Sequence, residues 1–460
     1  MTESSQVVIV GGGISGLSAA YDLVRAGIPH TLFEKRGRLG GVIETRTMEG
    51  CVLEGGPDSF ISQKPEALAL IRELGLEDQV IGSNDSTRIT YILRRGRLVP
   101  LPEGVLMIVP TRVWPMLKSP LLGWGAKLRM ALELAHRPAI FPDRSVAEFV
   151  IDHFGSETLD YLAEPLLSGV YGGDPREMSV GAVLPRFVEM EARYGSLGRA
   201  VWKTRSRQRS GGGPLFRTLK SGLGTMVERL ARNVSFRYAE VQSIERDSNG
   251  FRLRAEGNWA HAHELILACP AWTAAPLVAG LDPALAARLS EIPYTSSATV
   301  TLGFHASQFD GRQAGHGFLI PRKERRRMAA CTFVHEKFPD RAPADRMVLR
   351  CFFGGAGDEQ ALGESDESLI AMARAELQAI LGLTAVPRFT SISRWPRSMA
   401  QYTVGHAVRW KEIEARAAAI PGLYLAGNAY TGIGIPDCIR MGRKAAASAA
   451  IRLKQGQFVQ

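Results

Sequence analysis

The 460-residue sequence contains few cysteines and no long apolar run. Its five cysteines are isolated and form no CxxC pair, so we expect neither a disulfide framework nor a thiolate-bound cluster. A reducing, cytoplasmic setting fits this use of cysteine. No run of about 18 apolar residues occurs, which argues against a transmembrane helix. Glycines directly follow the short apolar run Val7–Val10, so a secretory signal is not expected either.

The sequence has more basic than acidic residues: 56 Lys and Arg against 46 Asp and Glu, which gives a formal net charge of +10. The basic residues are spread out, and the local cluster at 322–327 is compatible with a solvated turn. Zinc-finger spacing, a long basic helix and a stripe of alternating basic and aromatic residues are all missing, so we expect no nucleic-acid partner. We also find no Ser-His-Asp set, and we expect no metal.

The glycines near the N-terminus have a regular spacing that is typical of a nucleotide-binding loop. The sequence Gly11-x-Gly13-x-x-Gly16 lies between a predicted strand at 6–10 and a predicted helix at 17–26. Glycines there permit a tight turn and let the backbone approach a pyrophosphate at the helix N-terminus. Glu34 ends a second predicted strand, where its carboxylate can accept hydrogen bonds from ribose hydroxyls. This βαβ unit predicts a dinucleotide site; the alternative is a glycine-rich turn that binds nothing.

A second glycine pair, Gly40-Gly41, follows Glu34 and resembles the arrangement in FAD-binding, amine-oxidase-like flavoproteins. Near the C-terminus, a predicted strand at 423–426, a glycine-rich loop at 427–437 and a helix form another unit that can bring N–H groups to a flavin ring. No second GxGxxG is present, so an NAD(P)H domain is not expected. FAD is therefore the predicted cofactor.

The order of elements predicts an α/β fold: a Rossmann-type FAD-binding domain interrupted by a mainly helical insertion and by a β-rich substrate domain. The stretch at 104–134 mixes Trp114 and Trp124 with basic residues, which suits either a membrane surface or a cap over a pocket. The predicted segments are FAD-binding 1–85, helical 86–205, FAD-binding 206–285, β-rich 286–390 and FAD-binding 391–460.

Four segments carry a more specific resemblance: Glu54–Phe60, Glu164–Asp174, Met399–His406 and Gly427–Ile439. They resemble the oxygen-dependent porphyrinogen oxidases of heme biosynthesis, and the resemblance runs essentially end to end. It implies non-covalent FAD, a porphyrinogen substrate, six-electron oxidation and oxygen as acceptor. The residues that it implies as cofactor contacts are Gly11, Gly12, Gly13, Ile14, Ser15, Gly16, Glu34, Lys35, Val42, Gly56, Pro57, Asp58, Ser59, Val241, Trp395, Ile433, Gly434 and Ile435.

For some of these residues an ordinary structural role is also open: Val241 as a strand residue and Trp395 as core. A porphyrinogen is bulky and apolar with carboxylates at its edge, so its pocket should combine apolar walls with cations at the mouth. Lys64 is the candidate carboxylate partner, and Asp58 is a candidate for orienting a pyrrole N–H. Phe318 and Phe352 are expected to face the substrate, with plain core packing as the alternative.

Coproporphyrinogen carries four propionates and protoporphyrinogen two. The protoporphyrinogen enzymes place an arginine where this chain has Thr90, and the segments at 56–60 and 350–359 resemble the coproporphyrinogen type, although Phe352 replaces a tyrosine. We therefore favour coproporphyrinogen III over protoporphyrinogen IX. A flavin amine oxidase, a carotenoid desaturase and a flavin-bearing binding protein are competing interpretations of the same pattern. Peripheral contact with the inner membrane and a homodimer both stay open.

Overall fold

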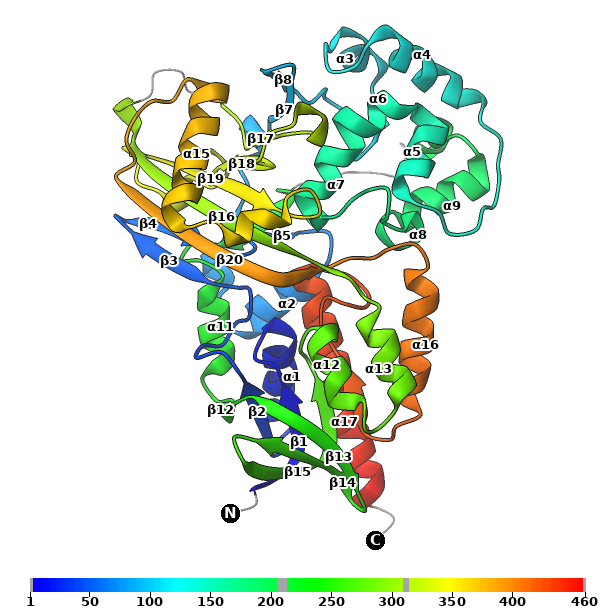
Figure 1. The fold of residues 1–460 in the computed structure, drawn as a ribbon, viewed down its shortest axis with the longest axis vertical. Helices are drawn as coiled ribbons and strands as arrows, with labels where there is room; N and C mark the ends of the chain where they lie inside the picture. The colour runs from blue at the N-terminus through cyan, green and yellow to red at the C-terminus, as the bar shows by residue number, and fades with distance from the viewer. Residues whose placement is uncertain (1–2, 205–212, 309–313, 458–460) are drawn as a thin grey trace.

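The computed structural model describes residues 3–204, 213–308 and 314–457. Two seven-stranded sheets dominate it, one near the two chain ends and one at the far end beside a group of helices (Figure 1). The α/β class predicted from the sequence is confirmed.

The first sheet is built from three distant parts of the chain. Its order is β12-β2-β1-β15-β14-β13, and β21 also pairs with β15. All of its pairings are parallel except those of the β13–β14–β15 meander. The apolar run Val7–Val10 lies in the middle and is buried, as expected for a strand covered on both faces. The strands are β1 (Glu3–Val10), β2 (His30–Glu34), β12 (Phe236–Tyr238), β13 (Val241–Asp247), β14 (Gly250–Ala255), β15 (Asn258–Leu267) and β21 (Leu423–Leu425).

Helices from both chain ends pack against this sheet. The first helix, α1 (Ile14–Arg25), lies against the last, α17 (Ile435–Gln457). The two approach so closely at Gly442 that a Cβ there would lie 2.1 Å from the Ser15 carbonyl oxygen. This contact places the C-terminal helix directly against the glycine loop region at the start of α1. The other helices of this half are α2 (Glu66–Glu73), α11 (Gly224–Ala231), α12 (Ala271–Val278), α13 (Pro283–Ser290) and α16 (His406–Ala418).

The second sheet has the order β20-β16-β19-β18-β17-β7-β8 and is antiparallel except between β17 and β7. One face forms a separate apolar core with α15 (Asp366–Leu381), which crosses the sheet in Figure 1. The other face carries Thr299, Arg350 and Trp395. The strands are β7 (Thr90–Arg94), β8 (Arg97–Pro100), β16 (Tyr294–His305), β17 (Gly317–Leu319), β18 (Ala330–Phe333), β19 (Arg346–Gly354) and β20 (Phe389–Ala400).

The insertion, which lies beside the second sheet in Figure 1, is helical, as predicted. Ser145 begins α5 with a capping box: its hydroxyl accepts from the Glu148 N–H, and the Glu148 carboxylate accepts from the Ser145 N–H. The helices are α3 (Val113–Lys118), α4 (Trp124–Leu132), α5 (Val146–Phe154), α6 (Ser156–Thr158), α7 (Glu164–Tyr171), α8 (Val180–Val183), α9 (Pro185–Tyr194) and α10 (Leu197–Thr204).

Short elements join these units: β3 (Thr45–Met48), β4 (Cys51–Glu54), β5 (Phe60–Ile61), β6 (Val80–Gly82), β9 (Val105–Leu106), β10 (Val109–Pro110), β11 (Phe216–Leu219) and α14 (Val334–Lys337).

Two predicted domain boundaries need correction. The β7–β8 hairpin, assigned above to the helical segment 86–205, is the edge of the second sheet. The boundary at 390/391 falls inside β20, which also belongs to that sheet. Both errors have one cause: hairpin and strand patterns are local, whereas the sheet that a strand joins depends on long-range pairing.

Candidate functional site

The glycine loop at 11–16 forms a turn that side chains would block. Gly11 has φ of +110°, and a Cβ on Gly16 would lie 1.9 Å from the Gly11 carbonyl oxygen. Gly13 is the N-cap of α1, and within the described chain no capping side chain accepts a hydrogen bond from the first turn. The N–H groups around Ile14 and Ser15 are thus available to an anionic group, such as a pyrophosphate, at the positive end of the helix.

Glu34 lies against this loop, where the βαβ pattern predicts it. Its Oε2 accepts from the Gly12 N–H at 2.7 Å and its Oε1 from the Arg36 N–H at 2.8 Å. Each carboxylate oxygen keeps a further lone pair that can accept from a ribose hydroxyl. Bonding to two backbone N–H groups fixes the direction of the carboxylate.

The second glycine pair is packed directly on the first loop. The Gly40 N–H donates to the Gly12 carbonyl at 2.8 Å, and a Cβ on Gly41 would lie 3.0 Å from the Gly13 Cα. The Arg38 guanidinium donates to the carbonyls of Leu39, Gly41 and Ile43, and burial lowers the pKa of Arg38. Its hydrogen bonds therefore hold the loop in shape.

Three implied cofactor contacts lie around this cradle. Lys35 follows Glu34 directly, with its ammonium 5.2 Å from the Trp272 ring centroid. Val42 is 36% exposed beside the second glycine pair. Val241 begins β13 and is buried, two residues after Ala239, whose N–H donates to the Glu34 carbonyl. All three are near the glycine loop in chain or in space, and the contacts with FAD stay predictions.

The carbonyl of Gly55 receives three side-chain donors from three neighbouring strands of the second sheet. These are Trp395 Nε1 at 2.8 Å, Arg350 Nη2 at 3.0 Å and Thr299 Oγ1 at 3.1 Å. Arg350 is buried and also donates to the Gly56 carbonyl. We call Thr299, Arg350 and Trp395 the Gly55 clamp. It holds the segment 55–59 against the second sheet.

The segment 56–59 is further constrained. A Cβ on Gly56 would lie 1.8 Å from the Val42 carbonyl oxygen. Pro57 comes next, and Ser59 Oγ donates to Asp58 at 2.6 Å. Lys337 of α14 donates to the same carboxylate at 2.9 Å.

Asp58 therefore has two partners within this chain, Ser59 and Lys337, that were not predicted from the sequence. Burial opposes its ionisation, but the charges of Lys337 and Arg350 outweigh burial, so the pKa of this carboxyl lies well below its ordinary value. Asp58 is held as an anion, which can accept a pyrrole N–H but cannot donate.

Lys64 and the C-terminal glycine loop meet in an ion pair that the sequence did not predict. Lys64 Nζ lies 2.6 Å from the Asp437 carboxylate, which is buried at the start of α17. Gly432, with φ of +122°, brings the loop back over this carboxylate. Ile433, Gly434 and Ile435 lie between Gly432 and Asp437 in the chain. The Lys64 side chain is 48% exposed, so it can still meet a substrate carboxylate, in competition with Asp437.

Phe318 and Phe352 lie on opposite faces of the second sheet, which corrects the expectation that both face the substrate. Phe318 pairs with Cys331, and Phe352 with Ala330, one residue out of phase. Phe318 is 1% exposed and packs edge to face on Phe333 in the apolar core. Phe352 lies beside Arg350, on the face of the Gly55 clamp. The substrate contact of Phe352 thus stays a prediction, and Phe318 takes the alternative of core packing.

The segment Glu164–Asp174 joins the insertion to the second sheet. Arg322 Nη1 lies 2.8 Å from Asp174, and its Nε lies 3.5 Å from Glu164. Burial raises the pKa of Glu164. A cavity of about 320 Å³ beside these residues has mainly charged walls, which do not suit an apolar ring system. The ion pairs here hold two units together.

The site residues that were not predicted from the sequence are Thr299, Lys337, Arg350 and Asp437. Arg350 and Asp437 lie within recognised segments, but no local pattern marks the other two. The cradle at 11–16 and 40–41 fits the pyrophosphate of a dinucleotide, because a Cβ on Gly11, Gly16 or Gly41 would lie 3.0 Å or less from a backbone atom, so that only glycine keeps the backbone this close. The carboxylate of Glu34 fits its ribose. The described residues therefore suit FAD.

Comparison with known proteins agrees with this geometry. The family model described as flavin containing amine oxidoreductase matches residues 14–450. Coproporphyrinogen III oxidase of Bacillus subtilis (strain 168) is 34% identical, over 96% of this chain and 97% of that protein. Protoporphyrinogen oxidase 2 of Arabidopsis thaliana is 25% identical, over 96% and 93%. A crystal structure from Exiguobacterium sp. 255-15 is provisionally described as that of a protoporphyrinogen oxidase. It aligns with this chain with a TM-score of 0.86 and 33% identity, over 98% of this chain and 99% of that chain.

Proposed function

Because the chain belongs to the family of flavin-containing amine oxidoreductases, we propose that it oxidises a porphyrinogen in heme biosynthesis, with coproporphyrinogen III as substrate. The cofactor is FAD. The observation that carries the proposal is the 34% identity, over nearly the whole of both chains, to a protein named coproporphyrinogen III oxidase. The cofactor cradle supports the proposal, because it suits the dinucleotide that this oxidation requires.

Bound FAD would supply a two-electron acceptor for each oxidation step. Aromatisation removes six hydrogen atoms from coproporphyrinogen III, and oxygen would take them up, three O₂ becoming three H₂O₂. The chain itself must position the macrocycle and keep its carboxylates in place. Asp58, held as an anion, can accept a pyrrole N–H, while Phe352 offers an apolar surface on the same face of the second sheet.

Cations near the site support a substrate with several propionates. Lys64 is half-exposed and Lys337 is partly exposed, and each is paired with one acid of this chain. Thr90, the position where protoporphyrinogen enzymes have an arginine, lies in β7 opposite Gly317 and supplies no charge. We infer that substrate carboxylates bind at the Lys64 side of the site.

Protoporphyrinogen IX is the second candidate, because the Exiguobacterium protein, which is provisionally described as a protoporphyrinogen oxidase, is 33% identical to this chain. The test is a side-by-side measurement of kcat/KM for both porphyrinogens in air, with porphyrin fluorescence as the readout. We expect kcat/KM at least about tenfold higher with coproporphyrinogen III, a difference of about 1.4 kcal/mol in transition-state binding. A higher value with protoporphyrinogen IX would reverse the substrate assignment.

We also propose that α3 and α4 touch a membrane surface. No helix in the described part of the chain is long and apolar enough to cross a membrane. Trp114 and Trp124 are 67% and 75% exposed, and the ammonium groups of Lys118 and Lys127 lie 5.3 and 4.7 Å from their rings. Exposed Trp with neighbouring Lys suits the boundary of lipid headgroups.

Co-sedimentation with anionic phosphatidylglycerol vesicles tests this contact. The wild type should sediment with the vesicles, and replacing both tryptophans by serine should reduce binding. Trp202 is 77% exposed on α10 and serves as the matched control. If the Trp114/Trp124 variant sedimented as well as the wild type, the membrane contact would be wrong. The alternative role of α3 and α4, a cap over a pocket, would then be favoured.

A further inference from the structure

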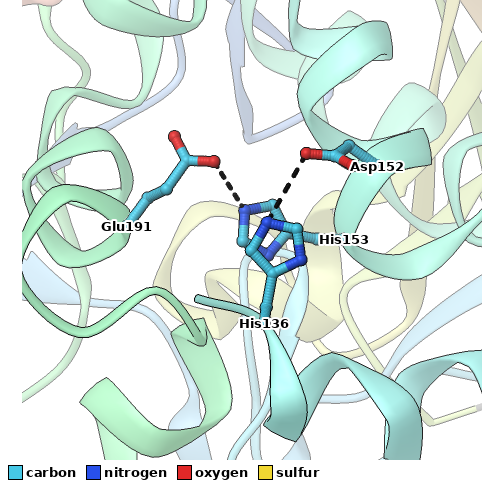
Figure 2. Close-up of side chains that lie close together, drawn as sticks. All are labelled: His136, Asp152, His153 and Glu191. Carbon is cyan, nitrogen blue, oxygen red and sulfur yellow. Dashed lines mark hydrogen bonds and ion pairs between the residues drawn. The ribbon is translucent and has the colours of Figure 1, made fainter. Parts of the chain in front are cut away.

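Four side chains with metal-binding atoms converge within the helical insertion, away from the cofactor cradle. His136, Asp152, His153 and Glu191 place one ligand atom each within 4.8 Å of all the others (Figure 2). They come from the turn after Glu133–Ala135, from α5 and from α9. His153 and Glu191 are buried, whereas the side chains of His136 and Asp152 are 23% and 37% exposed.

His153 has the orientation of a metal-binding histidine. Its Nδ1 lies 3.0 Å from Glu133 Oε1, while its Nε2 points to the cluster, 3.0 Å from Glu191 Oε1. Glu133 is itself fixed, because it accepts from Ser196 Oγ and from the N–H groups of Leu197 and Gly198. A carboxylate behind the far ring nitrogen sets the tautomer and direction of a metal-bound imidazole.

The acids of the cluster already have a cationic neighbour. Arg144 donates to Asp152 at 3.2 Å and to Glu191, and it uses the same two oxygens that the histidines approach. Its buried Nε has no hydrogen-bond partner among the described residues. Arg144 is therefore the group with which a metal ion would compete.

We propose that His136, Asp152, His153 and Glu191 bind one zinc ion, through Nε2 of each histidine and one oxygen of each acid. Two nitrogens and two oxygens suit Zn²⁺, and four protein ligands are typical of a structural site. Tetrahedral ligands about 2.0 Å from zinc lie about 3.3 Å apart. The ring of His136 is stacked on that of His153, with 4.3 Å between their centroids, so His136 must rotate out of this stack to direct its Nε2 at the ion, and the partly exposed Asp152 can move with it.

Such an ion would join the turn at His136 to α5 and α9. It would stabilise the helical insertion, since binding to the folded chain alone adds to the free energy of unfolding. The helix α4 leads directly into this turn and packs against α5, so the ion would also fix the base of the helix that carries Trp124.

The test uses full-length, FAD-loaded protein freed of metal by chelation and titrated with ZnCl₂ alone in a calorimeter. We expect one zinc per chain in the wild type. His136→Gln and Asp152→Asn should each weaken binding at least about tenfold, because each removes one ligand but leaves the buried Glu133–His153–Glu191 contact intact. Arg144→Gln should bind zinc more tightly than the wild type, because the competing cation is gone.

His261→Gln is the matched control, since His261 forms a pair with Asp247 at 3.0 Å in the first sheet. Zinc binding should be unchanged by it. FAD absorbance of every variant reports an intact fold independently of zinc. Absence of a one-to-one zinc isotherm in the wild type, or equal affinity in His136→Gln, would overturn the proposal and leave Arg144 as the resident cation of an all-protein ion network.

Discussion

The two halves of the candidate cofactor site are built by different means. The cradle at 11–16 and 40–41 is made of backbone, and its shape depends on the absence of side chains. The segment 55–59 is held by side chains from the second sheet, with three donors on the carbonyl of Gly55. The cradle should therefore lose its shape when side-chain atoms are added to its glycines. The segment 55–59 should lose its position when hydrogen-bond donors or charges are removed.

The largest effect should come from adding one methyl group to the cradle. Gly16→Ala would place a Cβ 1.9 Å from the Gly11 carbonyl oxygen, and the loop and α1 would have to separate. We expect FAD affinity to fall by at least about tenfold, measured as the ratio of flavin to protein absorbance after gel filtration. Gly125→Ala in α4 is the control, because no described atom outside its own helix turn lies within 4 Å of its added Cβ. Equal FAD content in Gly16→Ala and wild type would contradict the cradle.

Removing the central donor of the Gly55 clamp should affect stability most. Arg350→Met leaves the buried carbonyl of Gly55 and the half-buried carbonyl of Gly56 with one partner fewer each, and should lower the free energy of unfolding by about 3 kcal/mol, measured by urea denaturation. Arg72→Met removes an exposed pair with Glu77 and should cost less than about 0.5 kcal/mol. A similar, small loss in both variants would show that the clamp does not hold the segment.

The ion pair between Asp58 and Lys337 should make the stability of the protein depend on pH. Because the pKa of Asp58 is lowered in the folded chain, its stabilisation is fully present above the unfolded value of about 3.9 and is lost as pH falls below it. Asp58→Asn should thus be less stable than the wild type at pH 7, and the difference should narrow below about pH 4. Urea denaturation across this pH range checks the prediction. If the difference in the free energy of unfolding between the two proteins did not change with pH, Asp58 would not stabilise the fold as an anion.

The smallest effect concerns substrate binding. Lys64→Ala should raise KM for coproporphyrinogen III about three- to tenfold, because a half-exposed ion pair contributes about 1 kcal/mol. Asp437→Asn frees Lys64 from its partner and should not raise KM. If Lys64→Ala leaves KM unchanged, Lys64 acts only as the partner of Asp437.

The cradle was predictable from sequence because its parts are close along the chain. Gly11 to Gly16, and Glu34 at the end of the next strand, form a pattern that physical chemistry requires of a pyrophosphate site. The Gly55 clamp was not predictable in full. Trp395 was named as a cofactor contact, but its hydrogen bond to Gly55 joins residues 340 positions apart in the chain.

Strand register explains the error over the two phenylalanines. Phe318 and Phe352 both lie in strands, yet a shift of one residue in their pairing with β18 decides which face each occupies. The proposed zinc-binding set has no recognisable spacing, since His136, Asp152 and Glu191 are brought together only by helix packing. Its atoms could be found only in three dimensions.

Anaerobic reduction of the flavin tests the central claim most directly. The FAD-loaded protein is mixed with coproporphyrinogen III under argon, and absorbance near the flavin band is followed with porphyrin fluorescence. The account predicts loss of flavin absorbance together with formation of porphyrin, and recovery of the flavin band when air is admitted. A flavin band unchanged by either coproporphyrinogen III or protoporphyrinogen IX would contradict it.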